Sequence, residues 1–395
     1  MTAIWVTVFW LNLALLVYAY AGFPLLVVIM ARLQRRRVLQ APITPRLSLI
    51  IPVWNEARTI AARLDNALAL DYPGSALEII VVSDGSDDDT EAIVARYADR
   101  GVRLLALPRR GKLHAIREAV AGASGELLVF SDANSMYRRD ALRMLARNFA
   151  DPRVGGVCGN QIYLKAGHHA DSTNQGEQFY WSFDKWLKQQ ESLTGSIVSA
   201  HGAIYAIRRA LYRHPESAAV TDDFAISTAV IEQGYRLVFE REAVAHEEPV
   251  PAAAGEFHRK VRIMTRGWRG VLLRRKLLNP RRHGFYAVTL FSHKVMRRLV
   301  PVFLLLLFGV SLVLAPRHDF YAAAAWAQAL FYALAGLGYA LRQQRWGRLK
   351  LLALPFFYCL ANAAALVALV RVLRGDRIER WQPQRQMTAS GVPIA

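Results

Sequence analysis

The feature that most restricts the fold of this chain is a run of residues without any charge, from residue 4 to residue 30. It reads IWVTVFWLNLALLVYAYAGFPLLVVIM and exceeds the roughly 20 apolar residues that a helix needs to cross a bilayer. It is too long for the apolar core of a secretory signal peptide, and no cleavage site of small residues precedes the arginines after it. We therefore predict an uncleaved transmembrane anchor.

Three further apolar runs lie near the C-terminus, at about residues 299–315, 320–341 and 351–373. Four such runs grouped at the two ends of a chain favour membrane spans over buried core helices. The basic cluster from Arg32 to Arg37 directly follows the first run, which places the next part of the chain on the cytoplasmic side by the positive-inside rule. We predict a multi-pass protein of the cell (inner) membrane.

The sequence leaves the topology of the C-terminal part open. One span before the middle region and three after it put the C-terminal tail outside, whereas the basic residues of the tail favour the inside. Either one apolar run does not cross the membrane, or the tail departs from the rule. The basic residues concerned are Arg371, Arg374, Arg377, Arg380 and Arg385.

The middle of the chain alternates short apolar runs with segments of helical composition. This alternation predicts an α/β fold, with a mostly parallel, Rossmann-like sheet and helices on both faces. The expected strands are 46–53, 77–84, 102–108 and 125–132, and the expected helices are 55–70, 90–99, 112–121 and 224–233.

Polar residues, most of them acidic, follow three of these strands. They occupy residues 54–56, 84–89 and 132–135. Because the carboxyl ends of parallel strands meet at one edge of a sheet, where ligands bind in open α/β folds, these side chains are expected to line a shared cleft. The alternative is that they are ordinary turn and N-cap residues, and one residue among 87–90 is expected to cap the helix that follows.

The net charge is +19, from 50 Lys and Arg against 31 Asp and Glu, which favours anionic partners. Nucleic acid is the least favoured partner, because the basic residues cluster beside the apolar runs and no binding module is recognised. Carboxylates at a phosphate site require a divalent cation between them and the phosphate. Asp132 and Asn134 would present oxygen ligands to Mg²⁺ or Mn²⁺. Cys158 and Cys359 are expected to be packing residues.

Seven short segments of the middle region stand out together. They are SLIIPVWNE (48–56), VVSDGSDDDT (81–90), GKLHAI (111–116), SDAN (131–134), SAHGAIYAIRR (199–209), TDDFAIS (221–227) and SHKVMRRLVP (292–301). In these segments the chain resembles the inverting nucleotide-sugar glycosyltransferases of family 2, which have the GT-A fold. It resembles in particular the membrane-embedded branch of poly-N-acetylglucosamine, hyaluronan and cellulose synthases. The resemblance covers roughly residues 46–300.

The resemblance implies a role for each matching residue on the donor side. Pro52, Glu56 and Asp84 would hold the nucleobase and ribose, Lys112 would approach the donor phosphates, and Asp132 would contact the donor sugar or diphosphate beside the metal. The family usually has Asp-x-Asp where this chain has Asp132-Ala-Asn134. An Asn oxygen can ligate a cation but supplies no charge, so metal binding is expected to be weaker or differently shared.

On the acceptor side, the segment TDDF matches Thr-Glu-Asp of the family, which makes Asp223 the general base. The resemblance also puts His201, Gly202 and Asp222 there, although Asp222 could instead be an N-cap. The processive members carry Gln-x-x-Arg-Trp near the active site, whereas this chain has RKVRIMTRGWRG at 259–270. Arg262 and Arg266 are expected to replace it as diphosphate ligands and Trp268 as a platform for a sugar. This departure puts processivity in doubt.

These observations together predict a membrane-bound inverting glycosyltransferase that moves a sugar, most simply from a UDP-sugar, to a growing polysaccharide or a lipid acceptor. Single transfer to a lipid, a nucleotidyltransferase and a non-catalytic scaffold are the alternatives. Expected partners are the donor, the acceptor and membrane lipids, and a partner protein of a secretion or synthase complex is left open. The predicted parts are an anchor with its linker (1–38), a cytoplasmic domain (39–280), a basic interface segment (281–298), C-terminal spans (299–375) and a basic tail (376–395).

Overall fold

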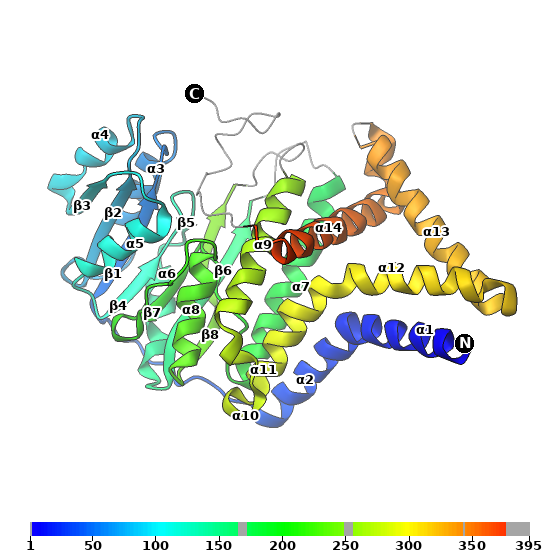
Figure 1. The fold of residues 1–395 in the computed structure, drawn as a ribbon. Coiled ribbons are helices and arrows are strands. Elements are labelled where there is room, and N and C mark those ends of the chain that lie inside the picture. Colours follow the sequence, from blue (N-terminus) through cyan, green and yellow to red (C-terminus); the bar gives the residue numbers. More distant parts are fainter. Residues whose placement is uncertain (1, 165–171, 249–255, 343, 377–395) are drawn as a thin grey trace.

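The computed structural model describes residues 2–164, 172–248, 256–342 and 344–376. Figure 1 shows an α/β domain on one side and long helices that extend away from it on the other. The predicted basic tail lies outside the described residues, apart from Asp376.

The centre of the domain, within the described residues, is one mixed sheet of eight strands, in the order β3-β2-β1-β4-β7-β6-β8-β5. Strands β1 to β4 form the parallel half that the sequence predicted, and β7 pairs antiparallel with β4. The remaining pairs are β6–β8, which is parallel, and β6–β7 and β5–β8, which are antiparallel. The strands are β1 (Leu47–Val53), β2 (Leu77–Asp84), β3 (Val102–Leu107), β4 (Leu127–Phe130), β5 (Met136–Tyr137), β6 (Val154–Tyr163), β7 (Tyr205–Arg208) and β8 (Arg236–Glu247).

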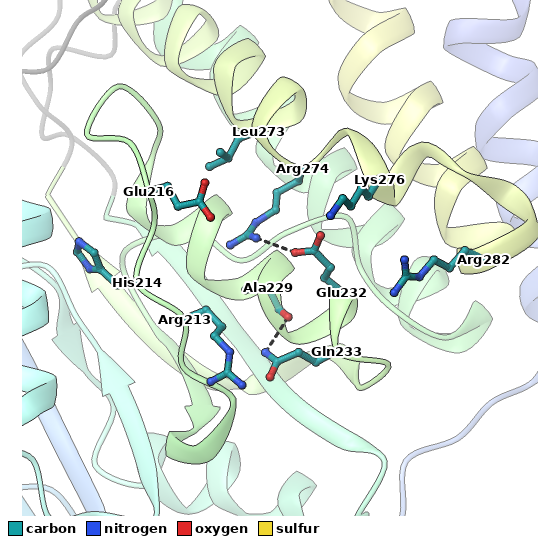
Figure 2. Close-up of a pocket in the computed structure, with 10 residues that line it drawn as sticks. All are labelled: Arg213, His214, Glu216, Ala229, Glu232, Gln233, Leu273, Arg274, Lys276 and Arg282. Atoms are coloured by element: carbon teal, nitrogen blue, oxygen red, sulfur yellow. Dashed lines mark hydrogen bonds and ion pairs between the residues drawn. The ribbon is translucent and has the colours of Figure 1, made fainter.

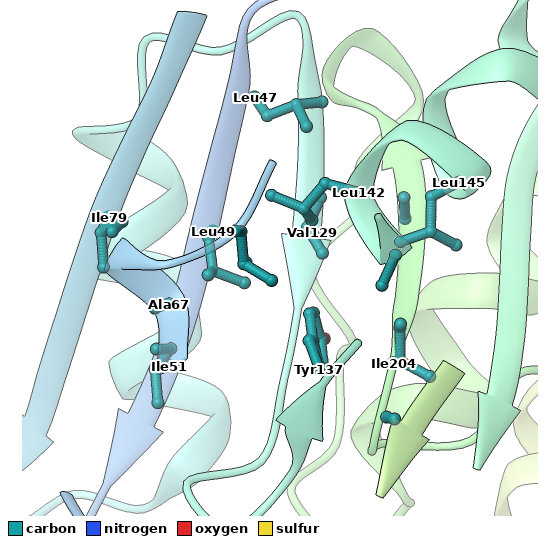
Figure 3. Close-up of a cluster of buried hydrophobic side chains, with 14 of the residues drawn as sticks. Leu47, Leu49, Ile51, Ala67, Ile79, Val129, Tyr137, Leu142, Leu145 and Ile204 are labelled. Atoms are coloured by element: carbon teal, nitrogen blue, oxygen red, sulfur yellow. The ribbon is translucent and has the colours of Figure 1, made fainter. Parts of the chain in front are cut away.

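Helices cover both faces of the sheet, as predicted. Strands buried on both faces read as continuous apolar runs, and every residue of β1 is buried. On one face, Leu49 and Ile51 pack with α3 (Ile60–Leu68), α4 (Thr90–Ala95) and α6 (Ala141–Ala146); Figure 3 shows part of this core. On the other face, Ile50 packs in a second core with α5, α8, α9 and α11. These are α5 (Lys112–Ala121), α8 (Asp222–Glu232), α9 (Glu256–Leu273) and α11 (Phe285–Leu290).

Two expected helices are shorter than predicted. The helix expected over 55–70 begins only at Ile60, because Asn55 has a left-handed backbone (φ 52°) and a turn over residues 57–59 precedes the helix. The helix expected over 90–99 ends at Ala95, and a separate 3₁₀ turn follows at Ala98–Arg100. The other expected helices agree with the structure to within two residues at each end.

In the part of the chain that the structure describes, four helices are long and apolar enough to cross a membrane, at the four places where the sequence predicted spans. They cover Thr2–Gln34, Phe285–Arg317, Asp319–Ala340 and Lys350–Leu373. The first consists of α1 (Thr2–Val17) and α2 (Phe23–Gln34), with a π-helical turn between them. The second contains α11, a π-helical turn and α12 (Arg297–Leu314), and the last two are α13 and α14. A further helix, α7 (Ser172–Thr194), packs between the domain and these helices, against α2 and α14.

Candidate active site

The acidic segments found in the sequence lie at one edge of the sheet. β1 pairs in parallel with both β2 and β4, so the three strands end side by side. β7 runs antiparallel to β4, and Tyr205 at its start is opposite Phe130 at the end of β4. His201 and Gly202, which precede β7, are therefore brought to the same edge. The strand ends therefore meet as the sequence predicted, and a shared ligand cleft at this edge stays a prediction.

Part of the acidic cluster after β2 has a structural role. The N–H of Ala57 donates to Asp88 Oδ2 (3.1 Å), and the side chain of Asn55 hydrogen-bonds Asp87. The N–H of Glu56 donates to Thr90 Oγ1 (2.8 Å). These bonds tie the turn after β1 to the turn after β2. Asp87 and Asp88 are therefore turn residues, which was the alternative that the sequence left open. A contact of a nucleobase with Glu56, or with the buried Pro52 in β1, stays a prediction.

Asp84 is fully buried at the end of β2 and organises the turn before α5. Its Oδ1 accepts hydrogen bonds from the N–H groups of Arg110 and Gly111 (2.8 Å each), and Arg109 Nη1 lies 3.8 Å from its Oδ2. Gly111 has a φ of +100°, which a residue with a side chain rarely adopts. Asp84 thus fixes the position of Lys112, the first residue of α5. Its direct contact with a donor stays a prediction.

Lys112 joins two acidic segments that are 90 residues apart in sequence. Its Nζ lies 2.8 Å from Asp132 Oδ1 after β4 and 3.0 Å from Asp222 Oδ2 at the start of α8. Burial alone would lower the pKa of Lys112, but the two carboxylates outweigh burial and raise it well above its ordinary value. Lys112 is therefore a permanent positive charge between two acids at the carboxyl edge of the sheet.

Asp222 and Asp223 begin α8, after the N-cap residue Thr221. Asp222 is the first helical residue, so the alternative that it is the N-cap is wrong. Burial raises the pKa of Asp223 to about 6, with the charge of Asp222 as the second cause. The pKa of Asp222 is lowered, because Lys112 and Arg266 outweigh its own burial. One carboxylate of the pair is therefore kept ionised, while its neighbour can take up a proton near neutral pH.

Gly202 lies directly against Asp132. A Cβ atom at this position would be 3.0 Å from Asp132 Oδ2, so a glycine leaves room beside the carboxylate. Among the residues that the structure describes, the buried Nδ1 of His201 has no hydrogen-bond partner, and burial together with the charge of Lys188 lowers the pKa of His201 to about 3. His201 is therefore a neutral imidazole, which suits hydrogen bonding rather than charge pairing.

Tyr205 is a residue of this region that sequence reasoning missed. Its ring stacks on Phe130 with centroids 4.8 Å apart, and its buried hydroxyl finds no hydrogen-bond partner within the described parts of the chain. Burial, and then the charges of Asp222 and Asp223, raise its pKa well above the ordinary value. Its position in the segment SAHGAIYAIRR was the only available signal, since a tyrosine at a strand start is ordinary.

Helix α9 holds the segment before α8 in place. The guanidinium of Arg266 donates to the carbonyl oxygens of Val220 (2.5 and 3.1 Å) and Ala218 (3.2 Å). Burial lowers the pKa of Arg262, and Arg266 adds to this effect. Trp268 is only 8% exposed, and the guanidinium of Arg298 lies 5.7 Å from its ring centroid. Diphosphate binding by the two arginines and stacking of a sugar on Trp268 stay predictions.

A divalent cation fits this site only with help from a substrate. Within the described residues, no group of three or more His, Cys, Asp and Glu side chains is arranged to hold a metal ion. Asp132 Oδ1 is engaged by Lys112, Oδ2 lies beside Gly202, and Asn134, whose side chain carries an amide oxygen, follows two residues later. Mg²⁺ is commonly held by one or two carboxylates plus substrate phosphates. The donor set present is compatible with that mode.

Comparisons with known proteins agree with this geometry. Residues 48–214 match the family model described as "Glycosyl transferase family 2". Poly-beta-1,6-N-acetyl-D-glucosamine synthase of Staphylococcus aureus (strain COL) is 26% identical over 234 residues, which is 58% of this chain and 56% of that protein. The protein of the same name from Staphylococcus epidermidis has the same identity and coverage. The chain thus matches little more than half the length of these curated relatives.

A solved structure shows the fold over most of the chain. Mannosyltransferase PcManGT from Pyrobaculum calidifontis, in complex with GDP-Man and Mn²⁺, has a TM-score of 0.68 and 24% identity, and covers 94% of this chain and 100% of that one. A mixed sheet of this order, with its acids and lysine gathered where the parallel strands end, is the fold of a GT-A glycosyltransferase. The family match narrows the class: residues 48–214, less than half of the chain, are similar to glycosyl transferase family 2.

Proposed function

We propose that this protein transfers a sugar from a nucleotide-sugar donor, most simply a UDP-sugar, to a growing polysaccharide at the cytoplasmic face of the cell membrane. The observation that supports it most strongly is Asp223, whose pKa is raised to about 6 beside the Asp222–Lys112–Asp132 cluster. Matched segments of the two staphylococcal synthases support a polysaccharide acceptor. The four candidate spans support a membrane location.

The proposed reaction is an inverting displacement with one base. The carboxylate of Asp223 takes the proton of an acceptor hydroxyl while that oxygen forms a bond to the anomeric carbon of the donor sugar. The bond between the anomeric carbon and the diphosphate oxygen breaks on the opposite face, and the electron pair leaves with the nucleoside diphosphate. Lys112 supplies positive charge beside that leaving group. Arg266 holds the backbone before α8 and so positions Asp223.

Asp132 and Asn134 are the residues that would hold Mg²⁺ or Mn²⁺ in this proposal, and Arg262 is a further diphosphate ligand. When bound, the cation would neutralise the charge that develops on the diphosphate. The residues proposed for the acceptor side are His201, Gly202, Asp222 and Trp268. Glu56, Pro52 and Asp84 are proposed for the nucleoside end of the donor.

The test is a donor panel on the purified full chain in nanodiscs, with Mg²⁺ or Mn²⁺ present. UDP-, GDP- and CDP-sugars are offered with membrane lipids, and released nucleoside diphosphate is measured. Asp223→Asn removes the base and is expected to lower turnover by about 10² to 10⁴-fold. Asp132→Ala is expected to abolish donor use, while Asp99→Asn, on an exposed turn of the same domain, is the matched control.

Turnover of one donor that is lost in Asp223→Asn and Asp132→Ala but kept in Asp99→Asn would support the proposal and identify the donor. The length of the product then separates polymer synthesis from single transfer to a lipid. Turnover that survives in Asp223→Asn would contradict the role of this residue. Failure of every donor to bind would contradict the transferase proposal for the isolated chain.

A further inference from the structure

A second candidate site lies near the C-terminal ends of α8 and α9, the two helices that bear Asp222, Asp223 and Arg266. A pocket of about 400 Å³ lies between the loop after β7, the C-terminal end of α8 and the segment that follows α9. Pockets of this size are typical of small-molecule sites. The side chains that carry the argument are Arg213, His214, Glu232, Arg274, Lys276 and Arg282 (Figure 2).

The charges around this pocket are predominantly positive. Arg274 is mostly buried and is already paired, with its Nη1 2.7 Å from Glu232 Oε2. Arg213, Lys276 and Arg282 are exposed, and within the described part of the chain none of the three forms an ion pair with a carboxylate. Figure 2 shows Arg213 with His214 on one side of the Arg274–Glu232 pair, and Lys276 with Arg282 on the other. Glu216 also lines the pocket, so four Lys and Arg side chains face two Glu side chains, and this excess of positive charge favours an anion.

The type of cation indicates the type of anion. Two arginines and one lysine offer planar and point-like donors, which suit phosphate oxygens, and a volume of about 400 Å³ exceeds what a single monovalent ion needs. We propose that this pocket binds a ligand carrying a phosphate group with two or more negative charges. The same chemistry is offered by an anionic lipid headgroup and by a soluble phosphate compound.

A ligand there would bridge the two helices of the candidate active site. Arg274 donates both to Glu232, at the end of α8, and to the carbonyl oxygen of Ala225, near its start (3.2 Å). A Cβ on Gly270 would lie 2.7 Å from the ring of Phe224, the residue after Asp223, so α8 and α9 are in close contact. Binding is therefore expected to stiffen both helices, even though the pocket contains no residue of the proposed reaction.

The experiment uses the full chain in nanodiscs and compares two double variants of equal charge. Lys276→Gln/Arg282→Gln removes two pocket cations, whereas Arg275→Gln/Arg281→Gln removes two exposed arginines of the same segments that do not line the pocket. In one arm, inorganic pyrophosphate is titrated into nanodiscs of phosphatidylcholine by calorimetry. In the other, phosphatidylglycerol replaces part of the lipid and no pyrophosphate is added. Hydrogen exchange of peptides covering 228–234 and 270–284 locates the protection.

We expect the affinity for pyrophosphate to fall about tenfold or more in Lys276→Gln/Arg282→Gln and to stay the same in Arg275→Gln/Arg281→Gln. In the unaltered chain, pyrophosphate should protect both peptides from hydrogen exchange. If the peptides are protected only in phosphatidylglycerol nanodiscs, and Lys276→Gln/Arg282→Gln removes that protection, the phosphate group that binds is that of a lipid headgroup. An equal loss in both pairs, or no protection in either arm, would overturn the proposal. The donor site is the same in both variants, so pyrophosphate bound there contributes equally to both. The difference between the two variants therefore reports on the pocket and does not depend on the proposed function.

Discussion

At the scale of single residues, Asp222 and Asp223 show how two adjacent carboxylates take different roles. The chemical groups are the same, but only Asp222 lies 3.0 Å from the lysine. Its pKa is lowered, while burial raises that of Asp223. Two acids whose environments separate their pKa values divide into an electrostatic partner and a proton acceptor. This division favours Asp223 over Asp222 as the base.

The pH dependence of the reaction follows from this difference. Below a pH of about 6 the Asp223 carboxyl is protonated and cannot accept a proton from the acceptor. We therefore expect kcat/KM to rise about tenfold per pH unit on the acidic side and to level off above pH 6. Initial rates from pH 4.5 to 8 with the donor found in the panel would measure it. A profile that is flat across pH 6, or one that Asp223→Asn retains, would contradict the assignment.

Gly202 provides a second test at the residue scale. In Gly202→Ala the new methyl group would be 3.0 Å from Asp132 Oδ2, so the carboxylate must shift away from it. Because Asp132 is the proposed ligand for the cation and donor, we expect the KM for the donor and the half-saturating Mn²⁺ concentration each to rise about tenfold. Gly74→Ala is the matched control, since a Cβ there meets no atom within 4 Å. Equal kinetics of the two variants would contradict this role for Asp132.

Much of the candidate site could be predicted from the sequence, because its residues follow strands that pair in parallel. Lys112 and Asp132 meet in the structure as that topology implies, whereas the place of Asp222 beside them was expected only from the family resemblance. The sequence alone could not show which of several neighbouring acids fix a turn and which face a ligand. Asp87 and Asp88 fix the turn after β1, and only the observed hydrogen bonds distinguish them from acids that face a ligand.

At the scale of elements, a buried charge cluster joins α7 to the helix Phe285–Arg317. His293 Nε2 lies 3.3 Å from Asp184 Oδ1 and its Nδ1 lies 2.8 Å from Glu191 Oε1. Lys188 Nζ pairs with Asp184 at 3.0 Å, and Glu191 Oε2 also accepts from the N–H of Val198. All four side chains are nearly inaccessible. The sequence marked the segment around His293 without indicating its partner, because the partner helix lies a hundred residues earlier.

Removal of His293 is expected to destabilise the docking of these two helices. His293→Ala leaves the buried carboxylates of Asp184 and Glu191 with one hydrogen-bond partner fewer each, and a buried polar group left without its partner costs about 1–3 kcal/mol. We expect a clear fall in the midpoint of thermal unfolding in detergent, with faster proteolysis of the domain. His258→Ala, which removes an exposed histidine of α9, should leave both unchanged. A loss of the same size in the two variants would contradict the structural role of this cluster.

At the scale of the whole molecule, the structure bears on the topology that the sequence left open. The carbonyl oxygen of Asp376, just after α14, accepts a hydrogen bond from Arg269 Nε of α9 (2.9 Å), so the end of α14 lies against the α/β domain. At the other end of the long helices, Arg317 after α12 contacts Thr2 of α1. Figure 1 shows α12 leading away from the domain and α14 returning to it. If α12 crosses the membrane, α13 and α14 together make one return crossing.

This arrangement predicts which positions share a side of the membrane. The arginines of residues 371–374 would then lie on the same side as the α/β domain, as the positive-inside rule requires, because one of the four apolar runs does not make a full crossing. Labelling of single-cysteine variants with a membrane-impermeant maleimide, in intact and in opened cells, would measure the side of the membrane on which each position lies. The unaltered chain gives the background labelling of Cys158 and Cys359. Arg317→Cys is expected to react in intact cells, whereas Arg374→Cys and Asp99→Cys should react only after opening. If Arg374→Cys, like Arg317→Cys, were labelled in intact cells, all four runs would cross the membrane. The contact between Arg269 and Asp376 could then not form.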